Sequence, residues 1–507
     1  MIVPEPSAAE VPPASSVIQS ISPPAARPFV LITAILGSAM GFLDGSVVAL
    51  AIAAIRDDLG ASLIQAQWIS NSYMLLLSAL VLIGGAAGDV FGVRLIFAAG
   101  VLVFTIASLL CAVAPDAQTL IILRALQGFG AAFMVPGSLA LIAKSYPPAQ
   151  RGAAIGTWAA AASMAAALGP FLGGMLLAVG DAWLWRLIFA INGPIGVVTL
   201  ILLLTRVPPD RPPSNRRLDY VGACLATLSL GLIAWGLTAF GLPPTLRLLP
   251  PGGWIMAGLL AGVLFVAWEK RASAPMVKLE LFASSAFTGA NIYTLILFFA
   301  FNGVLFFLPM TLISAWAIPE WQVSLLLLPL SVFIASLSGW AGRQADRQGP
   351  RMLLTTGAIL VGLSFALLSL TMPLMTLWRI SFPILAIMGL GMGLLVSPLS
   401  TAIMQAVPDE DSGLASGVNN AVARAAGLMA IAGLGAVAGL VFAAVAPDAS
   451  AQYGAIVHAT QTAGDLQRIA ATNMAFQVVA AISSAACFGA AAIAWLTQPG
   501  WKRSAAS

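Results

Sequence analysis

The chain has 507 residues, of which 60% are hydrophobic and 8% are charged, and its formal net charge is +4. Soluble proteins carry about 25% charged residues, so these few charges could not cover a soluble chain of this length, whereas a bilayer requires no polar coat. One histidine and three cysteines without a CxxC pair argue against a histidine-dependent hydrolase site, a metal cluster and a disulfide framework. We expect no cofactor, no metal and no nucleic-acid partner, because the basic residues lie in short loops between apolar runs.

Residues 1–28 are rich in Pro, Ala and Ser, and we predict a flexible tail there. Successive apolar runs follow, each approaching the roughly 20 residues that cross the hydrocarbon core as a helix. The runs predict an all-α membrane protein with 14 transmembrane helices, at residues 29–52, 68–87, 95–113, 120–143, 153–179, 187–204, 220–240, 252–268, 287–313, 323–341, 352–372, 380–404, 423–445 and 474–496.

The Lys and Arg residues are distributed unequally between the two sides of this arrangement. Sixteen of the 23 fall on the side of the chain termini, five fall on the other side, and Arg124 and Arg424 lie in or at the edge of spans. Cytoplasmic loops carry the excess of Lys and Arg. We therefore expect a multi-pass protein of the inner (plasma) membrane with both termini in the cytoplasm.

An internal repeat divides the chain. Gly85, Asp89, Gly92 and Arg94 recur 257 residues later as Gly342, Asp346, Gly349 and Arg351. Two similar halves are a known plan for transporters, with the substrate site between them near the midplane. The predicted arrangement is 6 + 2 + 6 helices: a tail at 1–28, a six-helix bundle at 29–206, an inserted two-helix segment at 207–286, a second six-helix bundle at 287–496 and a tail at 497–507.

Five motifs occur in order on these spans. They are Leu43-Asp44-Gly45-Ser46-Val47-Val48, the repeated loop motif, Arg124 with Gln127, Gly128 and Gly130, Gly169-Pro170-x-x-Gly173-Gly174, and Trp185-Arg186 followed by Phe189, Asn192, Pro194 and Gly196. With these motifs residues 29 to 496 resemble the major facilitator superfamily, and within it the fourteen-span drug:proton antiporter family (EmrB/QacA-like). The resemblance implies the major facilitator fold and proton-coupled export.

Asp44 is the only one of the 19 Asp and Glu residues that falls inside a predicted span. An intramembrane carboxylate is costly and is by default a functional-site candidate. Aligning Gly128 with Gly389 places Arg124 opposite Leu385, so the fold does not require a cation there. The resemblance implies that Arg124 takes part in proton coupling with Asp44. Arg424, near the start of its span, is interpreted as an interfacial anchor.

The loop motif is interpreted as a gate at the cytoplasmic ends of the two halves. Its predicted residues are Gly85, Asp89, Gly92, Arg94, Gly342, Asp346, Arg347, Gly349 and Arg351. An Asp there could meet a helix N-terminus or an Arg of the other half. The antiporter motif of the family corresponds to Gly169, Pro170, Gly173 and Gly174, which would let its helix bend and pack closely.

Aromatic and polar residues in three spans predict the substrate cavity: Asp44, Trp68, Asn71, Tyr73, Gln127, Tyr293, Phe298 and Asn302. An aromatic cavity with one acid suits amphipathic or cationic organic molecules.

The leading hypothesis is proton-coupled drug efflux by alternating access; the alternative is a proton-coupled importer or a narrow metabolite exporter. No P-loop or cluster of titratable residues supports an ATPase or another enzyme. We expect a monomer in the bilayer whose partners are protons and small molecules; in a Gram-negative cell a periplasmic adaptor could join it.

Overall fold

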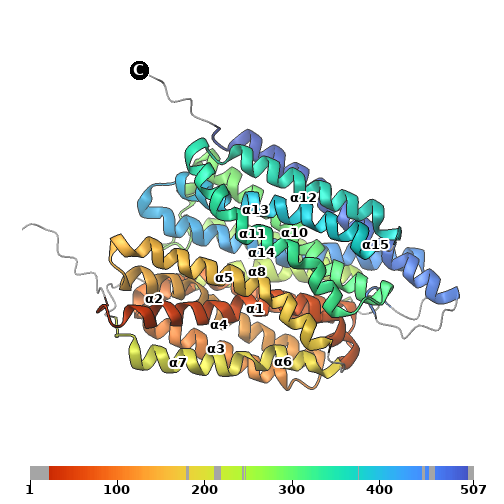
Figure 1. The fold of residues 1–507 in the computed structure, drawn as a ribbon, viewed down its shortest axis with the longest axis horizontal. Coiled ribbons are helices and arrows are strands. Elements are labelled where there is room, and N and C mark those ends of the chain that lie inside the picture. Colours follow the sequence, from red (N-terminus) through yellow and green to blue (C-terminus); the bar gives the residue numbers. More distant parts are fainter. Residues whose placement is uncertain are drawn as a thin grey trace, which may run out of the picture.

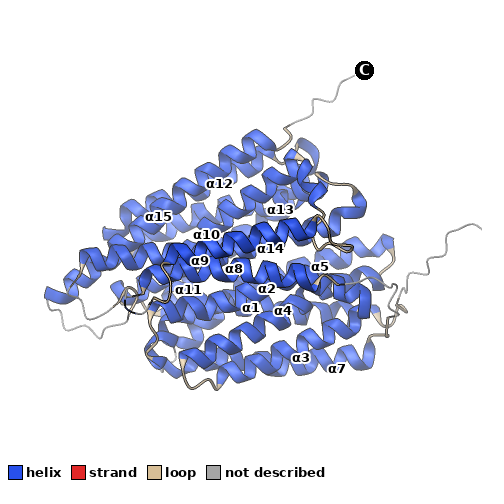
Figure 2. Cartoon of the chain, turned by 180° about the vertical axis from the view of Figure 1, so that it is seen from behind, coloured by secondary structure: helices blue, strands red, loops and turns tan. Residues whose placement is uncertain are grey.

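The computed structural model describes residues 22–500 except 179–181, 211–217, 243–244, 246, 375, 448–451 and 456–462. Most of the two predicted tails and His458 therefore lie outside the described residues. Over the described residues the secondary structure is helical and contains no strand (Figure 2). The expectation of an all-α fold is confirmed for this part of the chain.

Fifteen α-helices account for most of the described chain, with short 3-10 or π turns between some of them. Their bounds are α1 (Arg27–Leu59), α2 (Leu63–Phe91), α3 (Val93–Ala112), α4 (Ala117–Ser145), α5 (Pro148–Leu177), α6 (Trp185–Ala190), α7 (Asn192–Arg206), α8 (Tyr220–Thr238), α9 (Pro251–Glu269), α10 (Ser285–Trp316), α11 (Glu320–Gln348), α12 (Arg351–Thr371), α13 (Phe382–Gln405), α14 (Ser412–Val445) and α15 (Ala463–Thr497).

Thirteen helical segments in the described residues are long and apolar enough to cross a membrane, with α6 and α7 joined as one. Among its described residues α5 contributes a shorter apolar segment, Leu168–Leu177. Several helices extend beyond the predicted spans; for example, α14 begins at Ser412 rather than at residue 423. Hydropathy finds only the part of a helix inside lipid, whereas backbone hydrogen bonding and polar caps continue the helix beyond the roughly 30 Å hydrocarbon core.

The helices pack into two groups, α1–α7 and α10–α15 (Figure 1). Helices α2 and α3 pack on α4, and α1 packs on α4, α5 and α7; in the second group α11 packs on α13, and α15 packs on α10 and α12. The groups meet where α2 contacts α14 and where α5 contacts α11. Helix α8 packs on α9 and reaches both groups through α2 and α14. Two seams between the groups thus enclose the centre of the molecule.

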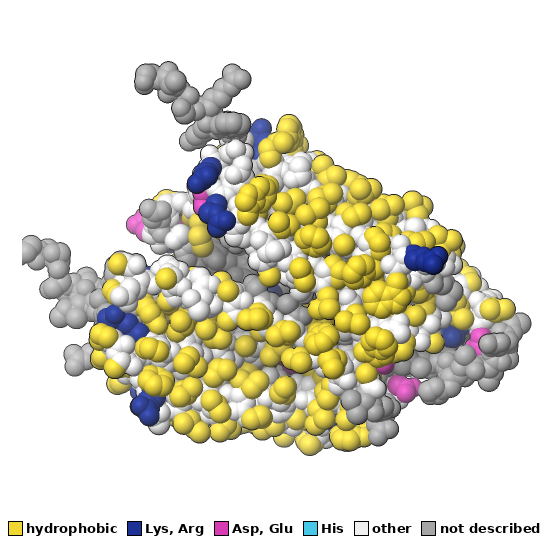
Figure 3. All heavy atoms as spheres, viewed as in Figure 1, with side chains coloured by type: hydrophobic (Ala, Val, Ile, Leu, Met, Phe, Trp, Pro, Cys, Tyr) yellow, Lys and Arg dark blue, Asp and Glu magenta, His cyan; other side chains and the backbone are white. Residues whose placement is uncertain are grey.

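Hydrophobic side chains cover the middle of the molecule, and most Lys and Arg side chains on the visible face lie near the helix ends (Figure 3). This is the distribution that a lipid environment requires. Helix α1 begins and α15 ends at the same end of the molecule, on the left in Figure 1. We call this end the terminal face and the opposite end the far face.

The repeated loops both lie at the terminal face. Gly92 follows α2 with a φ of 97°, and Gly349 follows α11 with a φ of 81°. Backbone at such angles is readily available only to glycine. The repeat that the sequence predicts therefore has a structural counterpart, in which each glycine turns the chain directly into the next helix.

Candidate functional site

A cavity of about 610 Å³ lies between the two groups, a volume that fits a drug-sized molecule. Its wall is built by α1, α2, α4 and α5 from one group and by α10, α11, α13 and α14 from the other. The lining runs from Pro309 and Ser324, nearer the far face, to Trp158 and Ser400 towards the terminal face. No lining residue comes from α8 or α9.

Asp44 and Arg124 form a buried ion pair beside this cavity. Nη1 of Arg124 donates to Oδ2 of Asp44 over 2.5 Å, and Nε2 of Gln127 donates to Oδ1 over 2.9 Å. Asp44 and Arg124 are each 1% exposed, and Gln127 is fully buried. Arg124 reaches the cavity wall, while Asp44 lies behind it. A carboxylate held in this way can stay ionised away from water, because two donors replace its hydration.

The guanidinium of Arg124 is held from several directions. Its Nε donates to the carbonyl oxygen of Ile69 over 3.1 Å, and its Cζ lies 4.3 Å from the ring centroid of Tyr73. A Cβ at Gly128 would lie 2.3 Å from the carbonyl oxygen of Tyr73, so only glycine permits this approach of α4 to α2. The close packing of α2 on α4 therefore helps to position Arg124 opposite Asp44.

A second layer of polar residues extends from Gln127 towards α7. Gln127 Nε2 donates to Ser108 Oγ over 3.2 Å, and Asn192 Nδ2 donates to the same oxygen over 2.9 Å. No sequence pattern predicted a specific role for Ser108 or Asn192. Asn192 belongs to one of the five motifs, so the sequence offered an indication of a role. Ser108 could not be identified from the sequence, because a single serine in an apolar run is common in membrane helices.

The predicted cavity residues separate into two sets. Tyr73, Phe298 and Asn302 line the wall. Trp68 instead packs against Trp235 of α8, with ring centroids 5.7 Å apart, and Tyr293 donates its hydroxyl to the carbonyl oxygen of Leu354 over 2.9 Å. Asn71 and Gln127 are buried behind the lining. Trp68 and Tyr293 therefore face neighbouring helices.

The antiporter motif lies in α5 where that helix meets α1 and α11. Ser324 Oγ donates to the carbonyl oxygen of Pro170 over 2.7 Å, and a Cβ at Gly174 would lie 1.7 Å from that Oγ. Gly169 and Gly173 face α1, where added Cβ atoms would lie 2.0 Å from Ser46 Oγ and 2.8 Å from Val47 Cγ1. The motif thus brings α5 against both groups.

Further hydrogen bonds join the groups at the far face. Arg56, at the end of α1, donates from Nη1 to the carbonyl oxygen of Tyr453 over 2.7 Å. The backbone N–H of Leu63 donates to Oε1 of Gln452 over 3.0 Å. Together with the contact of α5 and α11, these bonds close the far side of the cavity. Figure 3 shows a hollow between the groups towards the terminal face.

The predicted gate residues occupy the terminal face. Asp89 pairs with Lys144 at 3.2 Å, and Asp346 accepts a hydrogen bond from Thr401 over 3.4 Å, so each bonds within its own group. Two of the remaining gate residues bind backbone carbonyl groups at the ends of other helices in their own group, and the others lie near these turns. Arg94 donates to the carbonyl oxygens of Leu203 and Leu204, Arg351 donates to that of Gln498, and Gly85, Gly342 and Arg347 lie at the ends of α2 and α11.

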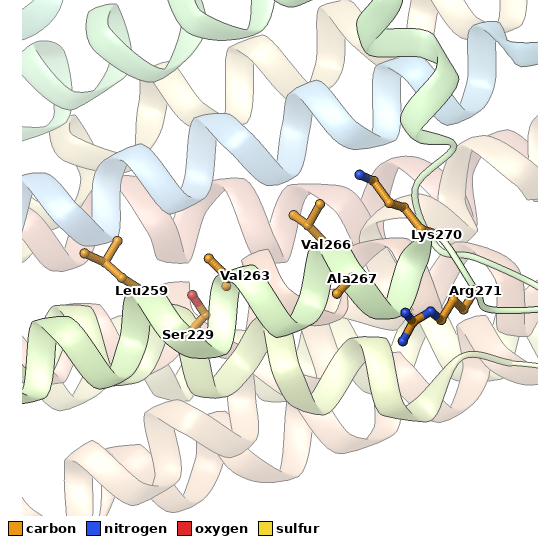
Figure 4. A pocket seen from close by; sticks show the side chains of 8 residues that line it. Ser229, Leu259, Val263, Val266, Ala267, Lys270 and Arg271 are labelled. Carbon is orange, nitrogen blue, oxygen red and sulfur yellow. The ribbon is translucent and has the colours of Figure 1, made fainter.

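A second hollow of about 550 Å³ lies on the outer surface of α8 and α9 (Figure 4). Ser229 and α9 residues line it, with Lys270 and Arg271 at one end. Neighbouring side chains of α9 are highly exposed, Val263 at 65% and Leu260 at 60%. This groove therefore faces the surroundings of the protein and is separate from the Asp44 network.

Comparison with known proteins agrees with this architecture. Residues 34–431 match the model of the Major Facilitator Superfamily. The methylenomycin A resistance protein of Bacillus subtilis is 33% identical over 80% of this chain and 86% of its own length. The probable actinorhodin transporter of Streptomyces coelicolor is 32% identical over 82% of this chain and 73% of its own.

Solved structures of low sequence identity share the fold. A bacterial homologue of the human lysosomal transporter Spinster, inward-facing and unoccupied, has a TM-score of 0.69 at 16% identity and covers 95% of this chain and 100% of its own. The inward-open xylose transporter XylE from E. coli has a TM-score of 0.60 at 16% identity, covering 94% and 97%. The chain is a multi-pass membrane transporter, not an enzyme, and it belongs to the Major Facilitator Superfamily.

Proposed function

We propose that this transporter exports amphipathic, drug-like organic molecules in exchange for protons. The observation that carries the proposal is the buried Asp44–Arg124–Gln127 network at the wall of the central cavity. Protonation of Asp44 would cancel its charge and weaken the bond to Arg124, freeing the guanidinium towards the cavity. Proton binding and substrate binding would then alter the same network, as exchange requires.

The proposed cycle is alternating access. In the structure the far side of the cavity is closed by the contacts of Pro170 with Ser324 and of Arg56 with Tyr453. Opening that side while the repeated loops close the terminal face would expose the cavity to the other compartment. The excess of Lys and Arg favours a cytoplasmic terminal face in the inner membrane. The proposed protein is a monomer of 6 + 2 + 6 spans, with the inserted pair, α8 and α9, outside the cavity.

The names of relatives support organic molecules of the antibiotic class as substrates. The relatives include resistance proteins for methylenomycin A and an export protein for tetracenomycin C. Three aromatic residues of α10 in the cavity wall, Phe298, Phe301 and Phe306, provide apolar surface for such molecules. Membership of the fourteen-span drug:proton antiporter family is part of this proposal.

The test is transport by the purified full-length protein in proteoliposomes with an imposed pH gradient. We expect a panel of amphipathic organic compounds to include substrates whose flux follows the gradient and is accompanied by opposite proton flux. Substrate flux that ignores the gradient, or proton movement in the same direction as the substrate, would contradict proton-coupled export.

A further inference from the structure

Arg424 is partly buried and lies well along α14, away from the membrane interface at which the sequence placed it. Helix α14 begins at Ser412, so Arg424 lies about 18 Å along the helix. One turn further on the same face, a Cβ at Gly427 would lie 3.1 Å from Met74 Sδ and 3.3 Å from the Asn302 amide. Met74 and Asn302 line the cavity, as does Ile431. Arg424 is not itself one of the lining residues, but it lies one turn before Gly427, next to the cavity wall on the side of the terminal face.

The guanidinium of Arg424 has no protein partner among the described residues. Its Nε is enclosed and meets no hydrogen-bond acceptor, whereas its two Nη atoms are not enclosed. The buried arginines are paired: Arg56 with the Tyr453 carbonyl, Arg124 with Asp44, and Arg468 with the Ser314 carbonyl. A partly desolvated guanidinium without a protein partner keeps its hydrogen-bond donors available to an anion.

The balance of charge around the cavity is positive. Asp44 is matched by Arg124, and no Asp or Glu occurs among the described residues of the cavity wall. Arg424 therefore adds one uncompensated positive charge. The expectation of a cationic substrate assumed a free Asp44 carboxylate, and in the structure that carboxylate is already bound by two donors.

Tyr73, next to Met74 on α2, is a further polar residue of this part of the wall. It lines the cavity, and Arg124 Cζ lies 4.3 Å from its ring centroid. Among the described residues the Tyr73 hydroxyl has no hydrogen-bond partner, and it is not enclosed. A phenolic hydroxyl in the cavity wall and a guanidinium on the neighbouring helix α14 together provide several donors for a carboxylate or phenolate oxygen.

We propose that Arg424, assisted by Tyr73, binds an anionic group of the transported molecule, so that the substrates are amphipathic organic anions. This inference rests on the proposed transport function and specifies its substrate class. The fold itself does not require a cation at this position. Gly152 and Gly156 recur 261 residues later as Gly413 and Gly417, which aligns Arg424 with Ser163 of the first half.

The test compares three fluorescent probes that share the dansyl group: dansylglycine, its neutral amide, and the cationic dansylcadaverine. Equilibrium binding is measured by fluorescence titration on the full-length protein in detergent, without a pH gradient. We expect the acid to bind about 10- to 100-fold more tightly than the amide, as for a hydrogen bond to a charged group. Arg424→Gln should remove that preference and leave the affinity for the amide unchanged, while Arg424→Lys should keep part of it.

Arg379→Gln is the matched control, since it removes an exposed arginine outside the cavity and should preserve the preference. An unchanged affinity for the amide shows that Arg424→Gln remains folded. The inference is overturned if wild-type protein does not prefer the acid, if it prefers the cation, or if Arg424→Gln keeps the preference. Preference for the acid without gradient-driven flux in proteoliposomes would instead contradict the proposed function alone.

Discussion

Ser324 of α11 donates a hydrogen bond to the carbonyl oxygen of Pro170 in α5 across 2.7 Å, at the seam between the two groups of helices. The neighbouring Gly174 allows this contact, because a Cβ there would lie 1.7 Å from Ser324 Oγ and 2.7 Å from the carbonyl oxygen of Glu320. A backbone atom cannot rotate away as a side chain can. The closed far side thus depends on a glycine of the antiporter motif.

Gly174→Ala should therefore open the far-face seam. We expect spin labels on Asp57→Cys and Leu466→Cys, two exposed far-face positions in different groups, to shift to longer distances, and transport to fall several-fold. Gly156→Ala on the same helix is the matched control, because an added Cβ there meets nothing within 4 Å. Equal distance distributions in the Gly174→Ala and Gly156→Ala proteins would show that the seam does not depend on Gly174.

Asp44→Asn should abolish substrate-linked proton flux while the protein remains folded. Asparagine keeps the size and one acceptor oxygen but cannot titrate at physiological pH. Losing one charge of a buried pair costs about 3 kcal/mol, so a lower melting temperature is expected as well. Asp58→Asn, which removes a half-exposed carboxylate of the same helix paired with Arg186, should retain proton flux. Undiminished flux in Asp44→Asn would place the proton site elsewhere.

Arg124→Leu should lose coupling but still fold. The second half has Leu385 at the matching position, and a solitary Asp44 can take up a proton rather than remain charged in an apolar site. We expect substrate binding without gradient-driven accumulation, measured by titration and by proteoliposome flux on the same preparation. Accumulation at the wild-type rate would mean that Arg124 has only a structural role.

Asp89→Asn should slow transport without removing its dependence on pH. In this structure Asp89 meets only a partly exposed Lys144, and such pairs contribute about 0–1 kcal/mol. Lys144→Gln breaks the same pair and is therefore the comparison. If Asp89 closes the terminal face in another conformation, Asp89→Asn should reduce the transport rate more strongly than Lys144→Gln. Equal rates would limit Asp89 to the pair seen here.

The orientation of the chain can be measured with single cysteines in a protein whose three native cysteines are replaced. Leu248, 90% exposed between α8 and α9, lies at the far face, and Ser273, between α9 and α10, lies at the terminal face. An impermeant maleimide should label Leu248→Cys on intact cells and reach Ser273→Cys only after lysis. The reverse pattern would place the terminal face outside.

The amino-acid sequence by itself determined the fold class and the repeat, and it singled out Asp44 as a candidate. Membrane helices must be long and apolar, so their positions can be read without tertiary information. Gly92 and Gly349 were predictable because a backbone turn with positive φ requires glycine wherever it occurs. Asp44 was evident because a carboxylate in a span is so costly that it rarely occurs without a role.

Only the tertiary structure decided which side chains meet. Asp44 and Arg124 are 80 residues apart on different helices, and their pairing depends on how α1 packs against α4. Trp68, Tyr293 and Phe298 are all aromatic residues of predicted spans, yet of these three only Phe298 lines the cavity. In a soluble protein the buried face of a helix can be identified because the opposite face is polar. A membrane helix is apolar both on the side that faces lipid and on the side that packs against other helices. The position of Arg424 next to the cavity wall therefore became visible only when α14 was packed against α2.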